Sequence, residues 1–463
     1  MSGGPVSGGP VSGGSGRTVA AVAAMLARGT SRPDRRRRRL MTGAAALATF
    51  FLTGAVNLLL IRGTTHSDWA GLVTEAGLRP GTALALVLLV VPVLALLHQV
   101  GRVAQATGER RLAALRLAGA TPGEVRLLGV AEAVRVGAVG AVLGGIAYVA
   151  AQRAGLTLAG VRDTGRYAVP LWALPLVAAV VVGAAVVVGV LVSRHVITSP
   201  LGVARRASRP RPGRFALVPL VAGVALMVAG SFFPSEEGGV PLFYSGAVLS
   251  ILGVALGASS IVLLSARAAG RRARRPETLL AARMLEADPR AWGRTMAVVG
   301  LVVMFGTGTG VVEYDVMKNA ADEDVSIGAF YVVSLGLTNA ALLFALLVAV
   351  SALVVHRAEA LLESGRSTAV LAAAGAPVRS LRRAALRQTL IAAGPVALVS
   401  ALAALVGAVP AAGALDTTPW LLLWMLGRGL LMVVVAVGAA ALVTLVSGRL
   451  VNRAAAPVHL RTA

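Results

Sequence analysis

The chain alternates between long apolar runs and short polar segments that are mostly basic. Apolar runs of about 20 residues are long enough to cross a ~30 Å hydrocarbon core as helices, and ten such runs recur along the 463 residues. We therefore predict an all-α polytopic membrane protein. The predicted spans are 41–61, 81–100, 127–151, 171–193, 215–233, 242–264, 295–312, 333–355, 386–408 and 420–446.

Composition supports this interpretation. The sequence is 57% hydrophobic and only 14% charged, whereas a soluble protein carries roughly a quarter charged residues. There is no cysteine, which excludes disulfides, thiolate metal sites and cysteine nucleophiles.

The distribution of basic residues predicts the orientation of the spans. Most of the 44 Lys and Arg residues fall on one side of the alternating spans, which the positive-inside rule assigns to the cytoplasm together with both termini. The net charge of +24 is then a topology signal for the cell membrane and an anchor for anionic membrane lipids. No nucleic-acid partner is expected, because no aromatic residues interleave a basic face. Only six basic residues fall on the outer side: Arg62, Arg79, Arg153, Arg162, Arg166 and Lys318.

The chain also repeats itself at an offset of 256 residues. This offset aligns Gly119 and Ala120 with Gly375 and Ala376, and six of the thirteen residues that end there are identical. It also overlays spans 1 to 4 on spans 7 to 10. Because six spans separate equivalent elements, the two halves run in the same direction through the membrane, an arrangement found in transporters.

The fold class is therefore two parallel four-helix repeats joined by a two-helix linker. The Gly/Ser/Pro-rich N-terminus cannot form a core and is expected to be disordered. The predicted segments are the tail 1–16, a basic juxtamembrane segment 17–40, the first half 41–193, the linker with spans 5 and 6 at 194–264, a basic cytoplasmic segment 265–294, the second half 295–446 and a cytoplasmic tail 447–463.

Each half places a polar helical element in the cytoplasmic loop between its second and third spans. Gly119 and Gly375 suit a helix C-cap, because glycine adopts the left-handed conformation at little cost. Thr121 would cap the following helix, with Pro122 at its first position and Glu124 at its third. We expect a helix, a tight turn and a second helix. This element either binds a partner or is a hairpin that merely connects two spans.

The same residues resemble the FtsX-like permease family of ABC transporters, the group of MacB-type and BceB-type membrane subunits. The segment 109–133, ERRLAALRLAGATPGEVRLLGVAEA, carries the most specific match, and 199–206 and 279–295 are also similar to the family. The ten-span 4+2+4 plan looks most like the BceB type. The resemblance implies two cytoplasmic ATPase subunits that bind ATP and Mg, and coupling through the hairpins 102–126 and 357–382. The implied coupling residues are Arg110, Leu115, Gly119, Ala120, Thr121, Pro122, Glu124, Arg366, Leu371, Gly375, Ala376 and Pro377.

Two features depart from the family pattern. Its members usually carry a large extracytoplasmic domain, whereas no predicted outer loop here exceeds 20 residues. The second half also has Pro377 and Ser380 at the positions of Thr121 and Glu124, so its hairpin is expected to couple less strongly.

The chain itself is not expected to be an enzyme. A P-loop requires Gly-x-x-x-x-Gly-Lys-Ser/Thr, and the only lysine is Lys318. The five histidines lack metal-ligand spacing, so neither a metal nor a cofactor is expected on this chain. ATP hydrolysis would come from a separate ATPase.

The remaining signals concern packing and buried charge. The GxxxG pairs 140/144, 253/257 and 306/310 predict close approach of helices. Glu132 and Arg135 have the spacing of an intramembrane pair, either structural or part of a substrate or coupling site. The acidic segment 313–325 is either a solvated outer loop or an attractant for cationic substrates.

We therefore expect the permease subunit of an ABC transporter. It would export an amphipathic or antibiotic-like small molecule, a peptide or a lipid, or extract it from the membrane. Two alternatives remain open. One is a non-transporting FtsX-like regulator that relays the state of an ATPase across the membrane, and the other is a secondary transporter that needs no ATPase.

Overall fold

The computed structural model is almost entirely helical in the part of the chain that it describes. This part comprises residues 32–61, 122–158, 164–197, 213–233, 239–319, 338–357, 374–413 and 419–448, together with a few single positions between them. The helices are α2 (Arg32–Leu60), α5 (Pro122–Leu158), α6 (Thr164–Tyr167), α7 (Ala173–Ile197), the 3-10 helix η1 (Arg214–Leu217), α8 (Val218–Phe232), α9 (Gly239–Arg271), α10 (Pro276–Ala287), α11 (Pro289–Asn319), α13 (Val378–Gly413) and α14 (Pro419–Val446), and the helix Thr338–Arg357.

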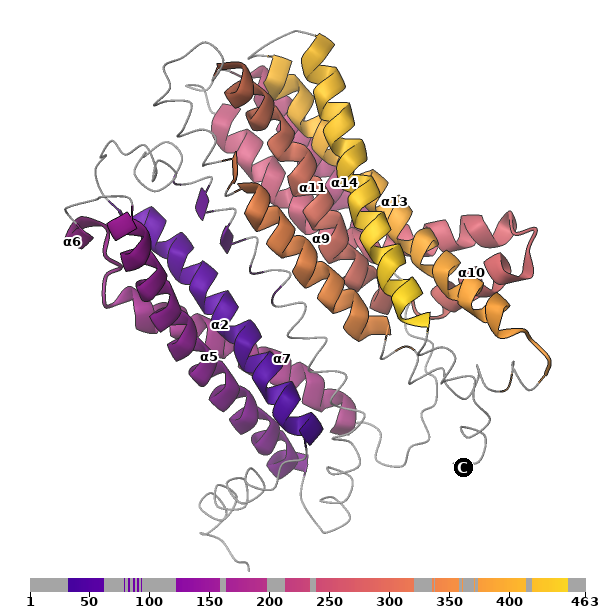
Figure 1. Cartoon of the computed structure of the whole chain (residues 1–463), viewed down its shortest axis with the longest axis horizontal. Coiled ribbons are helices and arrows are strands. Elements are labelled where there is room, and N and C mark those ends of the chain that lie inside the picture. Colours follow the sequence, from indigo (N-terminus) through magenta and orange to yellow (C-terminus); the bar gives the residue numbers. More distant parts are fainter. Residues whose placement is uncertain are drawn as a thin grey trace, which may run out of the picture. The chain divides into compact units, whose positions relative to one another are not determined.

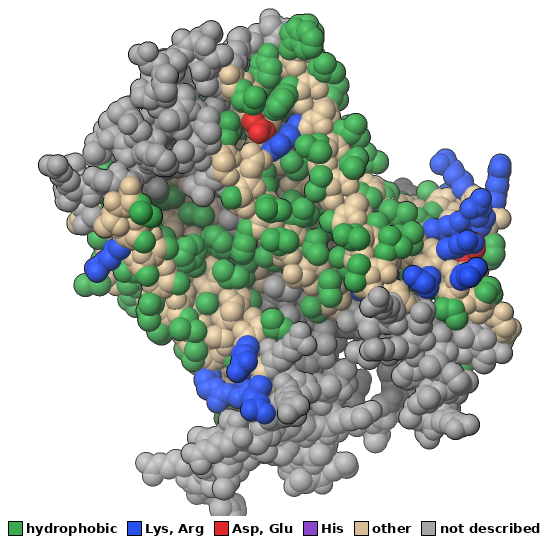
Figure 2. Space-filling view, viewed as in Figure 1, with side chains coloured by type: hydrophobic (Ala, Val, Ile, Leu, Met, Phe, Trp, Pro, Cys, Tyr) green, Lys and Arg blue, Asp and Glu red, His purple; other side chains and the backbone are tan. Residues whose placement is uncertain are grey.

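Eight of the described helices are long and apolar enough to cross a membrane. They coincide with eight of the ten predicted spans. Most of the predicted span 81–100 lies outside the described residues. The predicted span 171–193 corresponds to α7, whose apolar part Ala173–Val187 is shorter than the eight spanning helices. Figure 2 shows hydrophobic side chains covering much of the bundle surface, as a lipid-facing surface requires. The chain is a multi-pass helical membrane protein.

The chain divides into two compact units. The first consists of residues 1–53, 100–148 and 170–205, and the second of residues 54–99, 149–169 and 206–463. In the first unit α5 packs closely on α2: a Cβ atom added at Gly140 would lie 2.8 Å from Thr42 O, and one at Gly144 would lie 2.8 Å from Thr49 Cβ. The close approach predicted for this GxxxG pair is therefore confirmed.

In the second unit, α8 and α9 form a hairpin whose backbones touch. A Cβ atom added at Gly246 would lie 2.6 Å from Met227 N and 2.7 Å from Gly223 O, both of which are backbone atoms of α8. Gly223 lies against Gly246 in return. The other two predicted glycine pairs also lie at close contacts. The pair 253/257 lies against α8 and η1, and the pair 306/310 lies against α14.

The main core of the second unit lies where α9, α11, α13 and α14 pack side by side (Figure 1). Its residues come from all four helices, from α10 and from the helix Thr338–Arg357, and many are small, which lets the helices approach closely. The fully buried members include Ala258, Val262, Ala266, Leu285, Met296, Ala392, Ala393 and Val396.

A proline interrupts α13 inside this core. Pro395 has no N–H to donate to the carbonyl of Ile391, four residues earlier. The hydroxyl of Ser265 on α9 lies 2.9 Å from that carbonyl oxygen and 2.9 Å from Val262 O, so its single proton serves both. A neighbouring helix thus supplies the donor that the proline removes.

The basic segment predicted at 265–294 is more ordered than its composition indicates. It contains the end of α9, a short turn, the separate helix α10 and the start of α11. Asp288 separates α10 from α11, and its carboxylate accepts a hydrogen bond from Ala291 N at 3.2 Å, which is an N-cap contact. We call the end of the bundle that holds α10 the basic end, because arginines gather there (Figure 2).

Candidate functional site

The turn of the second predicted hairpin lies at the basic end, directly before α13. A helical turn ends with the hydrogen bond from Ala374 N to Val370 O at 2.9 Å. Gly375 then adopts φ +92°, the only positive φ among the described residues. After Ala376, Pro377 accepts the first bond of α13 from Ser380 N at 2.9 Å. The prediction that Gly375 terminates a helix in the left-handed conformation is confirmed.

The first hairpin can be followed only in part. The helix α5 begins at Pro122, the predicted first position, with Glu124 as its third residue. Glu132 is half-buried and Arg135 is exposed, and their pairing stays a prediction. The other predicted coupling residues lie outside the described residues: Arg110, Leu115, Gly119, Ala120, Thr121, Arg366 and Leu371.

A buried arginine joins the helices on the two sides of the second hairpin. Arg357, only 5% exposed, is the last described residue of the helix Thr338–Arg357, which precedes the hairpin in the sequence. Its guanidinium donates to Gln388 Oε1 at 3.2 Å and also to Ala385 O and Thr389 Oγ1, all on α13. Positions 385, 388 and 389 lie on one face of a helix.

The same guanidinium reaches α14 and an aromatic ring. Its Nη2 lies 3.4 Å from Thr444 Oγ1, and the two threonine hydroxyls of Thr389 and Thr444 lie 2.8 Å apart. The guanidinium carbon lies 4.8 Å from the centre of the Trp292 ring of α11, a cation–π distance. Arg357 therefore contacts α11, α13 and α14 through neutral groups.

A second contact, partly buried, involves an arginine of α13 and joins this helix to α10. Arg387 Nη1 lies 3.3 Å from Glu277 Oε2 and donates to Thr278 Oγ1, both in the first turn of α10. The pair is only partly exposed, at 23% and 13% of the side chains. Because Arg387 neighbours Gln388, a single turn of α13 is bonded both to α10 and to the helix Thr338–Arg357.

A third polar cluster lies at the opposite end of the bundle. Arg428 of α14 pairs with Glu313 at 3.3 Å, donates to Asn339 Oδ1 at 2.7 Å and donates through Nε to Gly306 O at 3.1 Å. Asn339 in turn donates to Glu313 Oε1 at 3.4 Å. Glu313 thus belongs to the helix α11, which continues to Asn319, and its side chain is only 13% exposed. The expected outer loop therefore begins later than 313, and positions 320–325 lie outside the described residues.

All three arrangements are hydrogen bonds, ion pairs or ring contacts that join one helix to another. Among the described residues, no three His, Asp or Glu side chains lie close enough together to hold a metal ion. No protein-family model, curated protein or solved structure matches the chain. The FtsX-like resemblance therefore stays a prediction from the sequence.

Sequence reasoning missed Arg357 and Arg387 as functional candidates. Arg357 directly follows one apolar run and Arg387 begins the next. Arginine commonly flanks membrane spans on the cytoplasmic side, so neither residue stood out. The sequence did contain a signal that could have identified them. Gln388 and Thr389 are polar residues near the start of the apolar run 386–408, and polar residues buried there need hydrogen-bond partners.

Proposed function

We propose that this chain is the permease subunit of an ABC transporter of the FtsX-like type. A separate cytoplasmic ATPase would supply the energy, with ATP and Mg bound to two copies of that subunit. The permease would use this energy to export an amphipathic or antibiotic-like compound, a peptide or a lipid, or to extract it from the membrane.

The proposal includes the finer topology. Ten spans form two parallel four-span halves around the linker spans 5 and 6, in the cell membrane, with both termini in the cytoplasm. Eight apolar helices support most of this plan. The basic end of the bundle would then face the cytoplasm, where the positive-inside rule locates Lys and Arg.

The observation that carries the proposal is the connection of the second hairpin to the bundle. The turn at Gly375 is exposed, and no atom of the described residues lies within 4 Å of a Cβ added there, so a partner can reach it. Fourteen residues after the turn, Thr389 accepts a hydrogen bond from Arg357 of the helix Thr338–Arg357, which precedes the hairpin. A displacement of the turn would therefore be transmitted to α13 and, through Arg357, to α11 and α14.

Affinity purification of the full-length chain in mild detergent tests the proposal, with the bound proteins identified by mass spectrometry. We expect two ATPase subunits per permease. Gly375→Leu, combined with Gly119→Leu, should abolish their recovery, because a non-glycine residue at φ +92° costs about 1–2 kcal/mol and reshapes the turn. Membrane insertion should not change.

The matched control is Gly438→Leu. Gly438 is exposed on α14, and no atom lies within 4 Å of a Cβ added there. This variant should retain the ATPase. Equal recovery of ATPase with wild type and with the hairpin variant would refute the proposal, as would purification of the wild-type chain with no ATPase, which a secondary transporter would give.

A further inference from the structure

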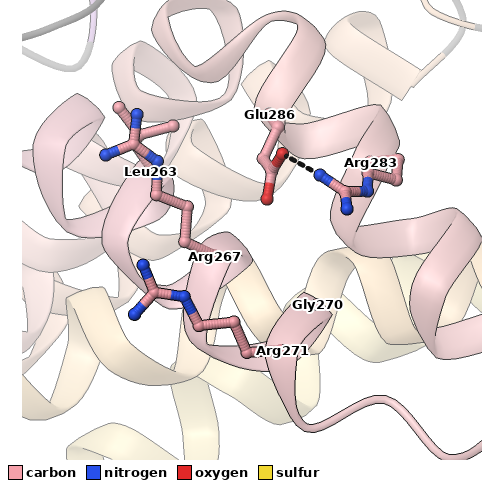
Figure 3. A pocket seen from close by; sticks show the side chains of 6 residues that line it. All are labelled: Leu263, Arg267, Gly270, Arg271, Arg283 and Glu286. Atoms are coloured by element: carbon pink, nitrogen blue, oxygen red, sulfur yellow. Dashed lines mark hydrogen bonds and ion pairs between the residues drawn. The ribbon is translucent and has the colours of Figure 1, made fainter.

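A basic pocket lies between the end of α9 and α10, apart from the hairpin and the Arg357 contacts. Its volume is about 290 Å³. Figure 3 shows Arg267 and Arg271 projecting from α9 on one side, with Arg283 and Glu286 of α10 on the other. The two helices pack against each other at its rim, where a Cβ added at Gly270 would lie at an ordinary contact distance of 3.5 Å from Ala282 Cβ.

The charges in this pocket are not balanced. Arg283 Nη1 pairs with Glu286 Oε2 at 2.8 Å, and Glu286 is the one acid among the lining residues. Within the described part of the chain, Arg267 and Arg271 donate no side-chain hydrogen bond and form no ion pair. Three arginines and one glutamate leave a net charge of +2. An anion with several oxygens would satisfy both guanidinium groups, and phosphate matches their geometry.

The position of the pocket along α9 indicates where that phosphate comes from. The helix has 33 residues, roughly 50 Å, so it extends past a ~30 Å hydrocarbon core. Leu256 and Leu264 are 60% and 41% exposed on the apolar part. At about 100° per residue, Arg267 and Arg271 lie on the same side of α9 as these two leucines. The lipid-facing stripe therefore leads directly to the two arginines.

From this geometry we propose that the pocket binds the phosphate of an anionic phospholipid. The acyl chains lie along Leu256 and Leu264, and the phosphate is held by Arg267 and Arg271, with Arg283 opposite. Glu286 keeps Arg283 oriented and disfavours a second anion. This site does not depend on the proposed transport function, because it uses neither hairpin nor ATPase.

Native mass spectrometry of the full-length protein in detergent tests the proposal. Phosphatidylglycerol, phosphatidylcholine and inorganic phosphate are titrated separately into the wild type, into Arg267→Gln/Arg271→Gln and into Arg272→Gln/Arg274→Gln. The last variant is the matched control. Arg272 and Arg274 are exposed and lie outside the pocket, and their substitution removes the same charge as the pocket variant.

We expect phosphatidylglycerol to bind the wild type and the control with similar affinity, and the pocket variant about 30-fold more weakly. Phosphatidylcholine and inorganic phosphate should bind far more weakly than phosphatidylglycerol. If inorganic phosphate binds as tightly as the lipid and binds the pocket variant more weakly, the pocket is a phosphate site. That result would refute the claim that the phosphate belongs to a lipid. Equal loss in both double variants would overturn the proposal, since it would show diffuse attraction to the basic surface. Unchanged lipid binding in the pocket variant would overturn it as well.

Discussion

The α8–α9 hairpin offers a direct test of the packing argument through Gly246→Ala. The added Cβ would lie 2.6 Å from Met227 N and 2.7 Å from Gly223 O, where ordinary contact begins at 3.4 Å. These are backbone atoms that cannot rotate away, so the helices must separate by roughly 0.7 Å. Overpacking of this kind costs about 1–3 kcal/mol, and a gap of that size forfeits a quarter to a half of each neighbouring contact.

The opposing effect is the higher helix propensity of alanine, about 1 kcal/mol. Because the obstruction is backbone, the steric cost belongs at the upper end of its range, and the clash exceeds the propensity gain. We expect the free energy of unfolding to fall by about 1–2 kcal/mol. The assay is equilibrium unfolding in mixed micelles with increasing SDS, followed by far-UV circular dichroism.

Gly438→Ala is the matched control, because it makes the same substitution on a helix where a new Cβ meets no atom within 4 Å. Its stability should equal or exceed that of the wild type. If Gly246→Ala unfolds at the same SDS fraction as Gly438→Ala, the hairpin backbones are not in contact and the reasoning fails.

Two further predictions concern the buried arginines and use the same unfolding assay. Glu313→Gln should destabilise the protein by about 3–5 kcal/mol, because it leaves Arg428 buried without its carboxylate. Adding Arg428→Gln should recover about 1–3 kcal/mol of that loss, and strict additivity of the two single changes would contradict the ion pair. Arg357→Lys should cost about 2–3 kcal/mol, since an ammonium group cannot span Gln388, Ala385 O and Thr389 as the planar guanidinium does. Arg379→Lys, at an exposed position near the start of α13, should be neutral, and an equal loss in both variants would refute the role of Arg357.

Local patterns in the sequence were sufficient for several features of the fold. Apolar runs predicted eight of the membrane helices, because the hydrocarbon thickness fixes their minimum length. Glycine spacing predicted the contact of α5 with α2, since small residues allow backbones to approach. The left-handed Gly375 followed from its position after a helical run and before Pro377.

Contacts between distant residues could not be read in the same way. Glu313 and Arg428 are 115 positions apart, and Arg357 and Thr444 are 87 apart. Whether such side chains meet depends on the rotation and vertical register of each helix, which local sequence patterns do not reveal. The helix α10 was missed for a different reason. Its arginine-rich surroundings are typical of a connecting segment, although Ala281 and Leu285 have the i,i+4 spacing of one buried helix face.

The proline in α13 has a mechanical consequence. Residues 378–391, about four turns of helix, carry the Arg357 acceptors and begin next to Gly375, whereas the residues after Pro395 lie deeper in the bundle. Since the ladder of backbone bonds is already open at Ile391, this first part can tilt without breaking another one, and the rotating hydroxyl of Ser265 can follow the carbonyl as it moves. The helix therefore resists bending least around Ile391–Pro395, between the exposed turn and the buried core.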